Sequence, residues 1–227
     1  MVFVTGDTHF PIDSDKLFKE QRGFPFATLQ RTDYVIVLGD FGLFWRKRDK
    51  YNARNMRQVQ ELPYTLLFLD GNHENFDWLE EFPVIEKFGG KVQWCGKNIL
   101  HLMRGEIYTI EGKRFFVCGG ATSTDKEFRR PHVSWWPREN LSGVEEREAI
   151  ENLENSSEPI DFILTHTCPE SIVEPMFNAA VIYDVTAKFL DNVKDRLPSI
   201  PWYFGHWHED KDWGRYHVLF QRILRIV

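Results

Sequence analysis

Short apolar runs recur along the chain and predict the strands of the fold. Each run is a few residues long and is bounded by glycine or polar residues, which is typical of buried strands. We expect strands over Val2–Thr5, Tyr34–Leu38, Thr65–Leu69, Ile107–Ile110, Arg114–Cys118, Phe162–Thr165, Trp202–Phe204, Tyr216–Leu219 and near Ile223–Val227.

Amphipathic stretches between several of these runs predict helices. The early part of the chain alternates strands with helices, which favours parallel pairing. The run from 107 to 118 and the C-terminal strands favour antiparallel or mixed sections. The pattern therefore predicts an α/β fold whose sheets are covered by helices. The expected helices are Asp13–Gln21, Tyr51–Glu61, Gly143–Asn155 and Tyr183–Arg196.

The composition favours one sizeable core and argues against disorder. Of the 227 residues, 42% are hydrophobic and 15% are aromatic. Such a chain can bury a core, whereas disordered chains are poor in aromatic residues. The sequence contains no repeat, low-complexity tract or Gly/Ser linker, so we expect residues 1–227 to form a single domain.

The charge and the cysteines limit the partners and the compartment. The formal net charge is −6, whereas proteins that bind nucleic acid through bulk electrostatics are usually basic. We therefore expect no stable nucleic-acid partner, although a nucleic-acid substrate at a local site is not excluded. Three cysteines without a CxxC pair (Cys95, Cys118 and Cys168) indicate reduced core thiols.

The N-terminal stretch "MVFVTGDTHF" has neither a basic region nor a long apolar region, which argues against a signal peptide. The sequence also lacks a run of about 18 apolar residues that would predict a membrane span. We expect a cytoplasmic protein without a membrane partner.

Five of the predicted strands end in a glycine, in a residue that can bind metal, or in both. The segments that follow them are "GDTH" from residue 6, "GD" from 39, "DGNHE" from 70, His166, and "GHWH" from 205. The carboxyl ends of strands are where sites are built in open α/β sheets. We therefore expect the potential metal ligands to converge on one edge: Asp7, His9, Asp40, Asn72, His166, His206 and His208.

Each of these motifs also has a structural explanation. A D-x-H pair alone is more often a capping or surface pair, a G-D pair is commonly a turn, and a lone histidine is often a hydrogen-bonded strand-end residue. The H-x-H pair is more specific, because side chains two apart in extended backbone point the same way. G-N-H-E is the most specific single motif. It is the occurrence of all five in order, each at a strand end, that favours a metal site.

The ordered set D-x-H, G-D, G-N-H-E, H and G-H-x-H resembles the calcineurin-like metallophosphoesterase superfamily. The motifs extend from residue 7 to residue 208, nearly the whole chain. The resemblance implies a four-layer α/β/β/α sandwich of two mixed sheets with a dinuclear metal site at the carboxyl edge of the strands. It also implies a general acid, His73, beside the leaving group of the substrate.

The resemblance implies three ligands for each ion and one shared ligand. Asp7, His9 and His208 would hold the first ion, Asn72, His166 and His206 the second, and Asp40 would bridge them.

The chemistry of this ligand set suits a phosphate ester. Two carboxylates neutralise part of the charge of two divalent ions, so the site stays positive towards a phosphate. A hydroxide shared by the ions would attack phosphorus, and His73 would protonate the leaving oxygen. Imidazole and carboxylate ligands favour transition metals. We expect Mn²⁺ first, with Fe, Zn, Ni or Co as alternatives.

The second motif departs from that of the protein Ser/Thr phosphatases of this superfamily, G-D-x-x-D-R-G. Leu43 and Phe44 occupy the positions of the acid and of the phosphate-binding arginine, which argues against a protein phosphatase. Phe10 follows His9 where a glycine is usual, and is expected to shape one wall of the cleft. Glu74 replaces the commoner aspartate of G-N-H-D.

The segment 119–141 is the candidate substrate-specificity loop. In one interpretation Lys126 or Arg129 binds a phosphate, and Trp135 or Trp136 stacks on a ring. In the other, the charges are solvated and the tryptophans belong to the core. Long loops in compact domains are usually functional or disordered, and the aromatic residues argue against disorder. Three histidines outside the motifs are expected to have no role in the site: His101, His132 and His217.

The leading hypothesis is a metal-dependent hydrolase of phosphate esters. The ester is a phosphodiester or a small-molecule phosphomonoester, with nucleotides among the candidates. The alternatives are a catalytically silent scaffold with the same fold and a nuclease of the same superfamily. The sequence does not fix the native substrate, the metal or the oligomeric state.

Overall fold

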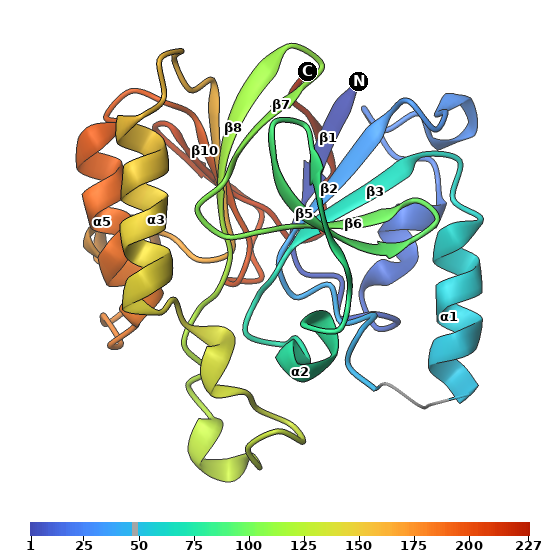
Figure 1. The fold of residues 1–227 in the computed structure, drawn as a ribbon, viewed down its shortest axis with the longest axis horizontal. Helices are drawn as coiled ribbons and strands as arrows, with labels where there is room; N and C mark the ends of the chain where they lie inside the picture. The colour runs from blue at the N-terminus through green and yellow to red at the C-terminus, as the bar shows by residue number, and fades with distance from the viewer. Residues whose placement is uncertain (47–49) are drawn as a thin grey trace.

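Two β-sheets and the helices that cover them make up the fold, shown as a ribbon in Figure 1. The computed structural model describes residues 1–46 and 50–227. The strands are β1 Val2–Thr5, β2 Tyr34–Leu38, β3 Thr65–Leu69, β4 Val84–Lys87, β5 Gly90–Gly96, β6 Ile99–Leu102, β7 Ile107–Ile110, β8 Lys113–Cys118, β9 Phe162–Thr165, β10 Trp202–Phe204, β11 Lys211–Trp213, β12 Tyr216–Val218 and β13 Leu224–Arg225. The α-helices are α1 Lys50–Gln60, α2 Phe76–Leu79, α3 Gly143–Glu154, α4 Glu170–Phe177 and α5 Val185–Arg196.

The first sheet has the strand order β13-β1-β2-β3-β6-β5-β4 over the described residues. Strands β1, β2, β3 and β6 are parallel, and β13, β5 and β4 pair antiparallel at its two sides. In register, Val2 is level with Tyr34 and Tyr34 with Thr65. The carboxyl ends of β1, β2 and β3 therefore lie side by side.

The second sheet has the order β11-β12-β10-β9-β8-β7 within residues 1–46 and 50–227. Strands β8, β9, β10 and β12 are parallel, and β7 and β11 are antiparallel at the two edges. Both sheets are therefore mixed, which confirms the predicted α/β fold of two mixed sheets.

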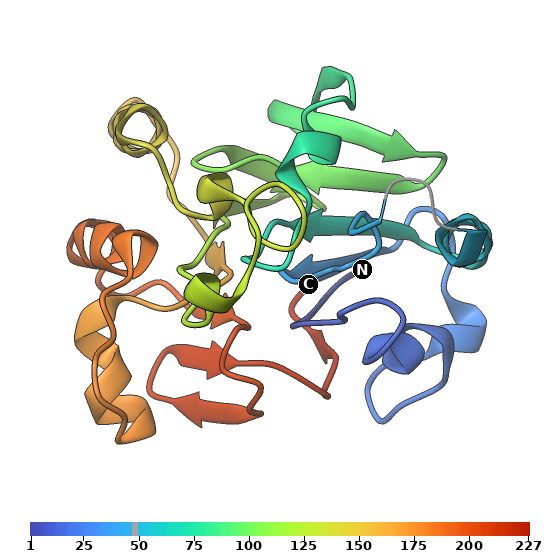
Figure 2. The ribbon, with the colours of Figure 1, turned by 90° about the horizontal axis from the view of Figure 1, so that it is seen from below.

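Alternation of side chains along each strand produces the layers. In β1, Val4 faces the core between the sheets, whereas Phe3 faces an outer core that includes Val59 of α1. In β8, Phe115 faces the core between the sheets, whereas Phe116 faces the helices α3, α4 and α5. Figure 1 and the view from below in Figure 2 place α1 on one side of the sheets and α3 and α5 on the other.

The predicted helix over Asp13–Gln21 is wrong in type and in length. The structure has a 3-10 helix over Ser14–Phe18, and the backbone is extended at Lys19, with φ −141° and ψ 154°. Lys16 turns inward from this segment and donates hydrogen bonds to the carbonyls of Gly6 and Asp7. A tertiary contact of this kind can override local helix preference.

The other predicted elements agree with the structure within one or two residues at most ends, except the last strand, which is shorter than predicted. Strands β4, β5, β6 and β11 and helices α2 and α4 were not predicted. All residues of β4 and β11 are exposed, so they lack the apolar pattern of a buried strand. Helix α2 is a single turn, and α4 contains Pro175, which is a helix breaker in sequence-based prediction. In the part of the chain described, no helix is long and apolar enough to cross a membrane.

Candidate metal centre

The carboxyl ends of parallel strands bring the candidate ligands of both sheets together. The first sheet supplies residues that follow β1, β2 and β3, and the second sheet supplies residues that follow β9 and β10. The backbone N–H of Gly205 donates to the carbonyl of His166 at 2.9 Å, and the backbone N–H of His9 donates to the backbone carbonyl of Asp40 at 2.9 Å. These backbone hydrogen bonds fix the strand-end loops relative to one another.

Several of these loops hold the backbone in an unfavourable conformation. Positive φ values are rare for residues other than glycine and cost energy, so they often mark functional sites. Five candidate ligands adopt φ between +33° and +66°: Asp7, His9, Asp40, His206 and His208. The positive φ values therefore coincide with five of the seven predicted ligand positions.

Four of the candidate ligands form a compact group of two carboxylates and two imidazoles. One ligand atom from each of Asp7, His9, Asp40 and His208 lies within 4.8 Å of all the others. His9 Nε2 lies 3.4 Å from Asp40 Oδ2, and His208 Nε2 lies 3.8 Å from Asp7 Oδ1. Oxygen and imidazole donors at these spacings can hold a transition-metal ion.

A second group of donors forms around His166. Its Nδ1 donates to the carbonyl of Leu38 at 2.8 Å, because a carbonyl can only accept. In the neutral imidazole, Nε2 therefore carries a lone pair. Nε2 lies 3.1 Å from Asn72 Oδ1 and 3.4 Å from Asp40 Oδ1. Burial lowers the pKa of His166, but Asp40 outweighs burial and raises this pKa to about 10. A proton on Nε2 and a metal ion are therefore the two cations that can satisfy these three converging acceptor atoms.

His206 lies on the same side of the site as His166. The two imidazole centroids are 4.9 Å apart. Burial, followed by the neighbouring His166, lowers the pKa of His206 to about 3. A neutral imidazole is the form that binds metal. The backbone N–H of His206 donates to both carboxylate oxygens of Asp7, at 3.0 and 2.9 Å, and so links the two groups of donors.

The two carboxylates are buried close to each other. Burial raises the pKa of Asp7 to about 7, partly opposed by His166. Burial also works to raise the pKa of Asp40, but His166 and His9 outweigh it and hold this pKa well below its usual range. Buried charges in proteins are paired or coordinate metals. Over the described residues, the ion-pair partners of these carboxylates are histidines, so the donor set fits a metal ion.

His73 lies beside these donors and is oriented by two contacts. Its backbone N–H donates to Asp40 Oδ1 at 2.7 Å. The guanidinium of Arg129 faces its ring, with Nη1 3.2 Å from Nδ1 and Nη2 3.4 Å from Nε2. Burial lowers the pKa of His73, Asp40 opposes this, and Arg129 adds to the lowering.

The Gly39 position illustrates how closely the loops approach one another. Gly39 has φ +86°, and a Cβ built there would overlap the ring of His166. We expect Gly39→Ala to lower the free energy of unfolding by about 1 kcal/mol from the positive φ alone, and by more from the displaced ring. Urea unfolding would measure this, with Gly112→Ala as a control, because φ there is also positive, at +72°, while the surrounding space is open. Equal losses in both variants would contradict the close approach.

A comparison with known protein families identifies the chain. The calcineurin-like phosphoesterase family matches residues 1–210. The chain belongs to this family. The resemblance predicted from the ordered motifs is therefore confirmed, and the chain is a phosphoesterase, a hydrolase of a metal-dependent family.

Curated members of this family that resemble the chain are lariat debranching enzymes. The enzyme of Schizosaccharomyces pombe is 25% identical over 191 residues, which cover 75% of this chain and 37% of that protein. Lariat debranching enzyme A of Xenopus laevis is 25% identical over 175 residues, 70% of this chain and 31% of that protein. The Homo sapiens enzyme is 30% identical over 118 residues, 50% of this chain and 20% of that protein. The matches thus span well under half of the length of these relatives.

The residues that depart from the phosphatase motif contribute to the packing and hydrogen bonding of this phosphoesterase. Leu43 and Phe44 are buried in the outer core of the first sheet, where Phe44 stacks on Phe68 at a centroid distance of 5.6 Å. Glu74 is also buried, and its Oε1 accepts a hydrogen bond from the backbone N–H of Phe41 at 2.7 Å. The segment after β2 is therefore held by packing and by Glu74.

The loop 119–141 contributes some of its predicted residues to the site and buries others. Arg129 reaches His73, and its Nε forms an ion pair with Asp125 at 2.8 Å. Lys126 is exposed and does not line the two pockets beside the donors. Trp136 is packed in the core, and its Nε1 donates to Asp77 at 2.8 Å. For Trp136, the core interpretation is therefore correct.

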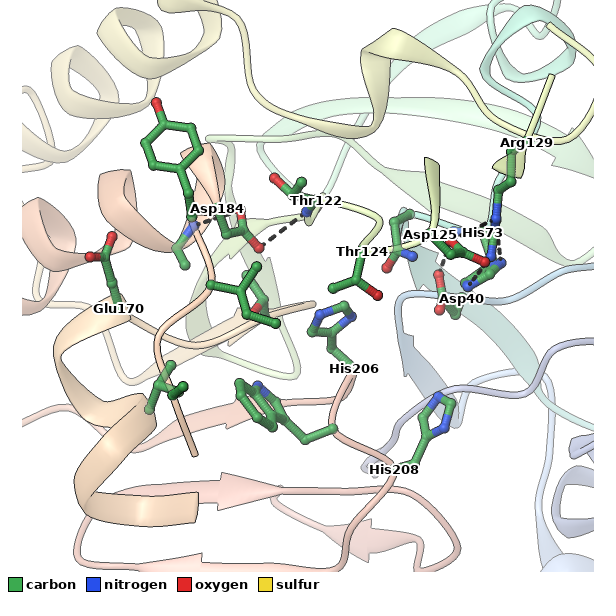
Figure 3. Close-up of a pocket in the computed structure, with 18 residues that line it drawn as sticks. Asp40, His73, Thr122, Thr124, Asp125, Arg129, Glu170, Asp184, His206 and His208 are labelled. Carbon is green, nitrogen blue, oxygen red and sulfur yellow. Dashed lines mark hydrogen bonds and ion pairs between the residues drawn. The ribbon is translucent and has the colours of Figure 1, made fainter. Parts of the chain in front are cut away.

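Two pockets open beside the donors and share His73 and Arg129. The first has a volume of about 390 Å³ and extends from Asp40 and His206 to Asp184. Figure 3 shows its length, with Glu170 and Asp184 at one end and Arg129 and His73 at the other. The second, of about 290 Å³, lies on the side of His9 and is lined by His9, Phe10, Ile12, Gly42, Trp45, His73, Arg129 and Ser134. The predicted wall role of Phe10 agrees with this placement.

The sequence analysis missed a buried ion pair behind the G-N-H-E segment. Asp70 Oδ2 accepts hydrogen bonds from Arg104 Nε at 2.8 Å and Nη2 at 2.6 Å, and its Oδ1 lies 3.1 Å from His101 Nε2. Arg104 also donates to the carbonyls of Arg138, Glu139 and Asn140. His101, which was expected to be outside the site, thus supports the segment that carries Asn72 and His73. Asp70 at the end of β3 was the available signal for this network.

Proposed function

We propose that the chain is a two-metal phosphodiesterase. The observation that carries this proposal is the pair of pockets that share His73 and Arg129 beside the metal donors. A phosphodiester has two substituents on one phosphate, and a phosphomonoester has one. A phosphate at the junction of the two pockets would direct one substituent into each, and volumes near 300 Å³ suit small organic groups.

The proposed ligands follow the two groups of donors. Asp7, His9 and His208 would hold one ion, and Asp40, which lies in the same group of ligand atoms, would be shared with the second. Three further residues would hold the second ion: Asn72, His166 and His206. The ions supply Lewis acidity to the phosphate and lower the pKa of coordinated water. Mn²⁺ is the proposed ion, and Fe, Zn, Ni and Co suit the same donors.

The residues of the chain position the ester and move a proton. Arg129 presents a guanidinium at the junction of the pockets, where it donates to a phosphate oxygen. His73 donates a proton to the leaving oxygen, and Asp40 fixes the backbone of His73 through the 2.7 Å hydrogen bond. Binding of a phosphate removes Arg129 from the His73 ring, which favours the protonated imidazole that this step needs.

The loop 119–141 is the proposed specificity segment. It contributes Thr122, Thr124, Asp125 and Arg129 to the first pocket. Substitutions of these four pocket-lining residues would therefore change the preference among esters more than the metal content.

The names of the curated relatives favour a second candidate, lariat debranching by a nuclease of this family. The local guanidinium of Arg129 suits an anionic substrate, although the net charge of the chain is −6. Cleavage of a labelled lariat, compared with a linear strand of the same sequence, would separate this candidate from a small-molecule diesterase.

The test of the proposed function is a paired assay on Mn²⁺-loaded protein. Bis(p-nitrophenyl) phosphate and p-nitrophenyl phosphate share one leaving group and differ in the second substituent. We expect a higher kcat/KM for the diester, and loss of activity on metal chelation. A higher kcat/KM for the monoester would refute the diesterase assignment, and activity that survives chelation would refute the metal mechanism.

A further inference from the structure

Asn72 of the G-N-H-E motif begins a series of buried hydrogen bonds whose other members, Ser123 and Glu139, lie outside the five motifs. Asn72 Nδ2 donates to Ser123 Oγ at 3.2 Å, and Ser123 Oγ donates to Glu139 Oε2 at 2.6 Å. The backbone N–H of Ser123 donates to the other oxygen, Oε1, at 2.9 Å. Both oxygens of Glu139 are therefore occupied by the same residue.

The donor and acceptor order of these hydrogen bonds determines which way the Asn72 amide faces. The hydroxyl of Ser123 has one proton, and it donates this proton in the hydrogen bond to the carboxylate of Glu139. The oxygen of that hydroxyl can then only accept from Asn72, so the NH₂ group must face Ser123. The carbonyl oxygen, Oδ1, is thereby turned towards His166 Nε2, 3.1 Å away. Only the amide oxygen is a suitable donor to a metal ion.

Glu139 is itself held in place by the surrounding backbone. Its side chain is fully buried, and Ser123 and Asn72 are also buried. Its carbonyl accepts hydrogen bonds from Ala121 N at 3.1 Å and from Arg104 Nη2 at 3.1 Å. Arg104 connects this carbonyl to Asp70, two residues before Asn72. The carboxylate and the amide are thus fixed relative to each other.

We propose that Ser123 and Glu139 are positioning residues that orient the amide of Asn72 for the second metal ion. The inference rests on the two-metal assignment of the proposed function. It assigns a role in metal binding to two residues of the loop 119–141 that do not touch the ion. Residues that orient metal ligands typically change metal affinity by about 10–100-fold when they are replaced.

The decisive variant is Glu139→Gln, which keeps the size of the side chain. A glutamine offers one acceptor and one NH₂ group, so it cannot accept from both the N–H and the hydroxyl of Ser123. When its NH₂ group faces Ser123 Oγ, the hydroxyl proton is free to point at Asn72. The amide of Asn72 then turns over and presents its NH₂ group to the metal position. Ser123→Ala removes the hydroxyl, and with it the hydrogen bonds to Asn72 Nδ2 and to Glu139 Oε2.

The experiment is calorimetric titration of metal-stripped protein with Mn²⁺. For the unchanged protein we expect two ions to bind. For Glu139→Gln and Ser123→Ala we expect the affinity of one ion to fall about 10–100-fold, while the affinity of the other stays within about twofold. Thermal unfolding of the stripped proteins, measured in parallel, would show whether each variant is folded.

The matched control is Glu145→Gln. Glu145 belongs to the same region, where it accepts from Ser142 at 2.7 Å and lies 3.6 Å from Arg104, but it has no hydrogen bond to Ser123. We expect this variant to keep both affinities. Two unchanged affinities in the folded Glu139→Gln and Ser123→Ala variants would overturn the positioning role alone, as would an equal fall at both ions. Binding of a single ion by the unchanged protein would instead overturn the two-metal proposal.

Discussion

Replacing His73 with glutamine is expected to lower kcat by about 10²–10⁴-fold for a diester with an alkyl leaving group. The reason is the placement of His73, which lines both pockets but is not among the proposed metal ligands. An alkoxide needs a proton as it departs, whereas p-nitrophenolate leaves readily without one. The loss should therefore be much smaller for bis(p-nitrophenyl) phosphate, and the ratio of the two losses measures the proton transfer.

The control for this prediction is His132→Gln. His132 is exposed and pairs with Asp77 at 3.0 Å, outside both pockets. We expect its kinetics to match those of the unchanged protein, and the metal content of both variants to stay the same. A loss in His73→Gln that is equal for the two leaving groups would show that His73 acts in binding rather than as the acid.

Replacing Arg104 with methionine is expected to lower the free energy of unfolding by about 3–5 kcal/mol. The guanidinium of Arg104 forms two hydrogen bonds to buried Asp70 and others to three carbonyls. Nearby Arg104, with His101, outweighs burial and holds the pKa of Asp70 far below its usual range. Without Arg104, this carboxylate would remain buried with one histidine as its partner. Urea unfolding at neutral pH would measure the loss.

Two further variants separate the destabilisation caused by the unpaired buried charge from the destabilisation caused by lost packing. Asp70→Asn combined with Arg104→Met removes both charges, so we expect part of the stability to return relative to Arg104→Met alone. Arg138→Met removes an exposed arginine that pairs with Glu80, and should cost less than about 1 kcal/mol. A double variant no more stable than Arg104→Met would attribute the loss to packing and to the unpaired carbonyls.

Most strands were predictable from sequence because burial on both faces produces runs of apolar residues. Strands β1, β2 and β3 are buried along almost their whole length, and their predicted bounds match the structure. Of the missed strands, β6 is buried, but His101 interrupts its short apolar run, and the other three carry little of this signal. Strand β5 alternates only in part, and β4 and β11 are exposed. Such strands form because a neighbouring strand offers unpaired backbone groups, which a local pattern does not record.

The candidate ligands could be predicted because parallel strands end at a common edge. Asp7, Asp40 and Asn72 follow neighbouring strands of one sheet, so their convergence follows from the order of the motifs. Which residues of the loop 119–141 face the site, and which do not, could not be predicted in this way. Arg129 and Lys126 are similar in charge and close in sequence, yet only Arg129 faces His73.

The sequence by itself determined the α/β class, the order of the strand-end motifs and, through them, membership of the phosphoesterase family. Only the tertiary structure decided which residues support those motifs. Glu139, Ser123 and Arg104 lie far along the chain from the strand ends that they hold, and no spacing connects them to Asn72 or Asp70. Their role arises because a buried polar group must find a hydrogen-bond partner wherever the fold brings one within reach.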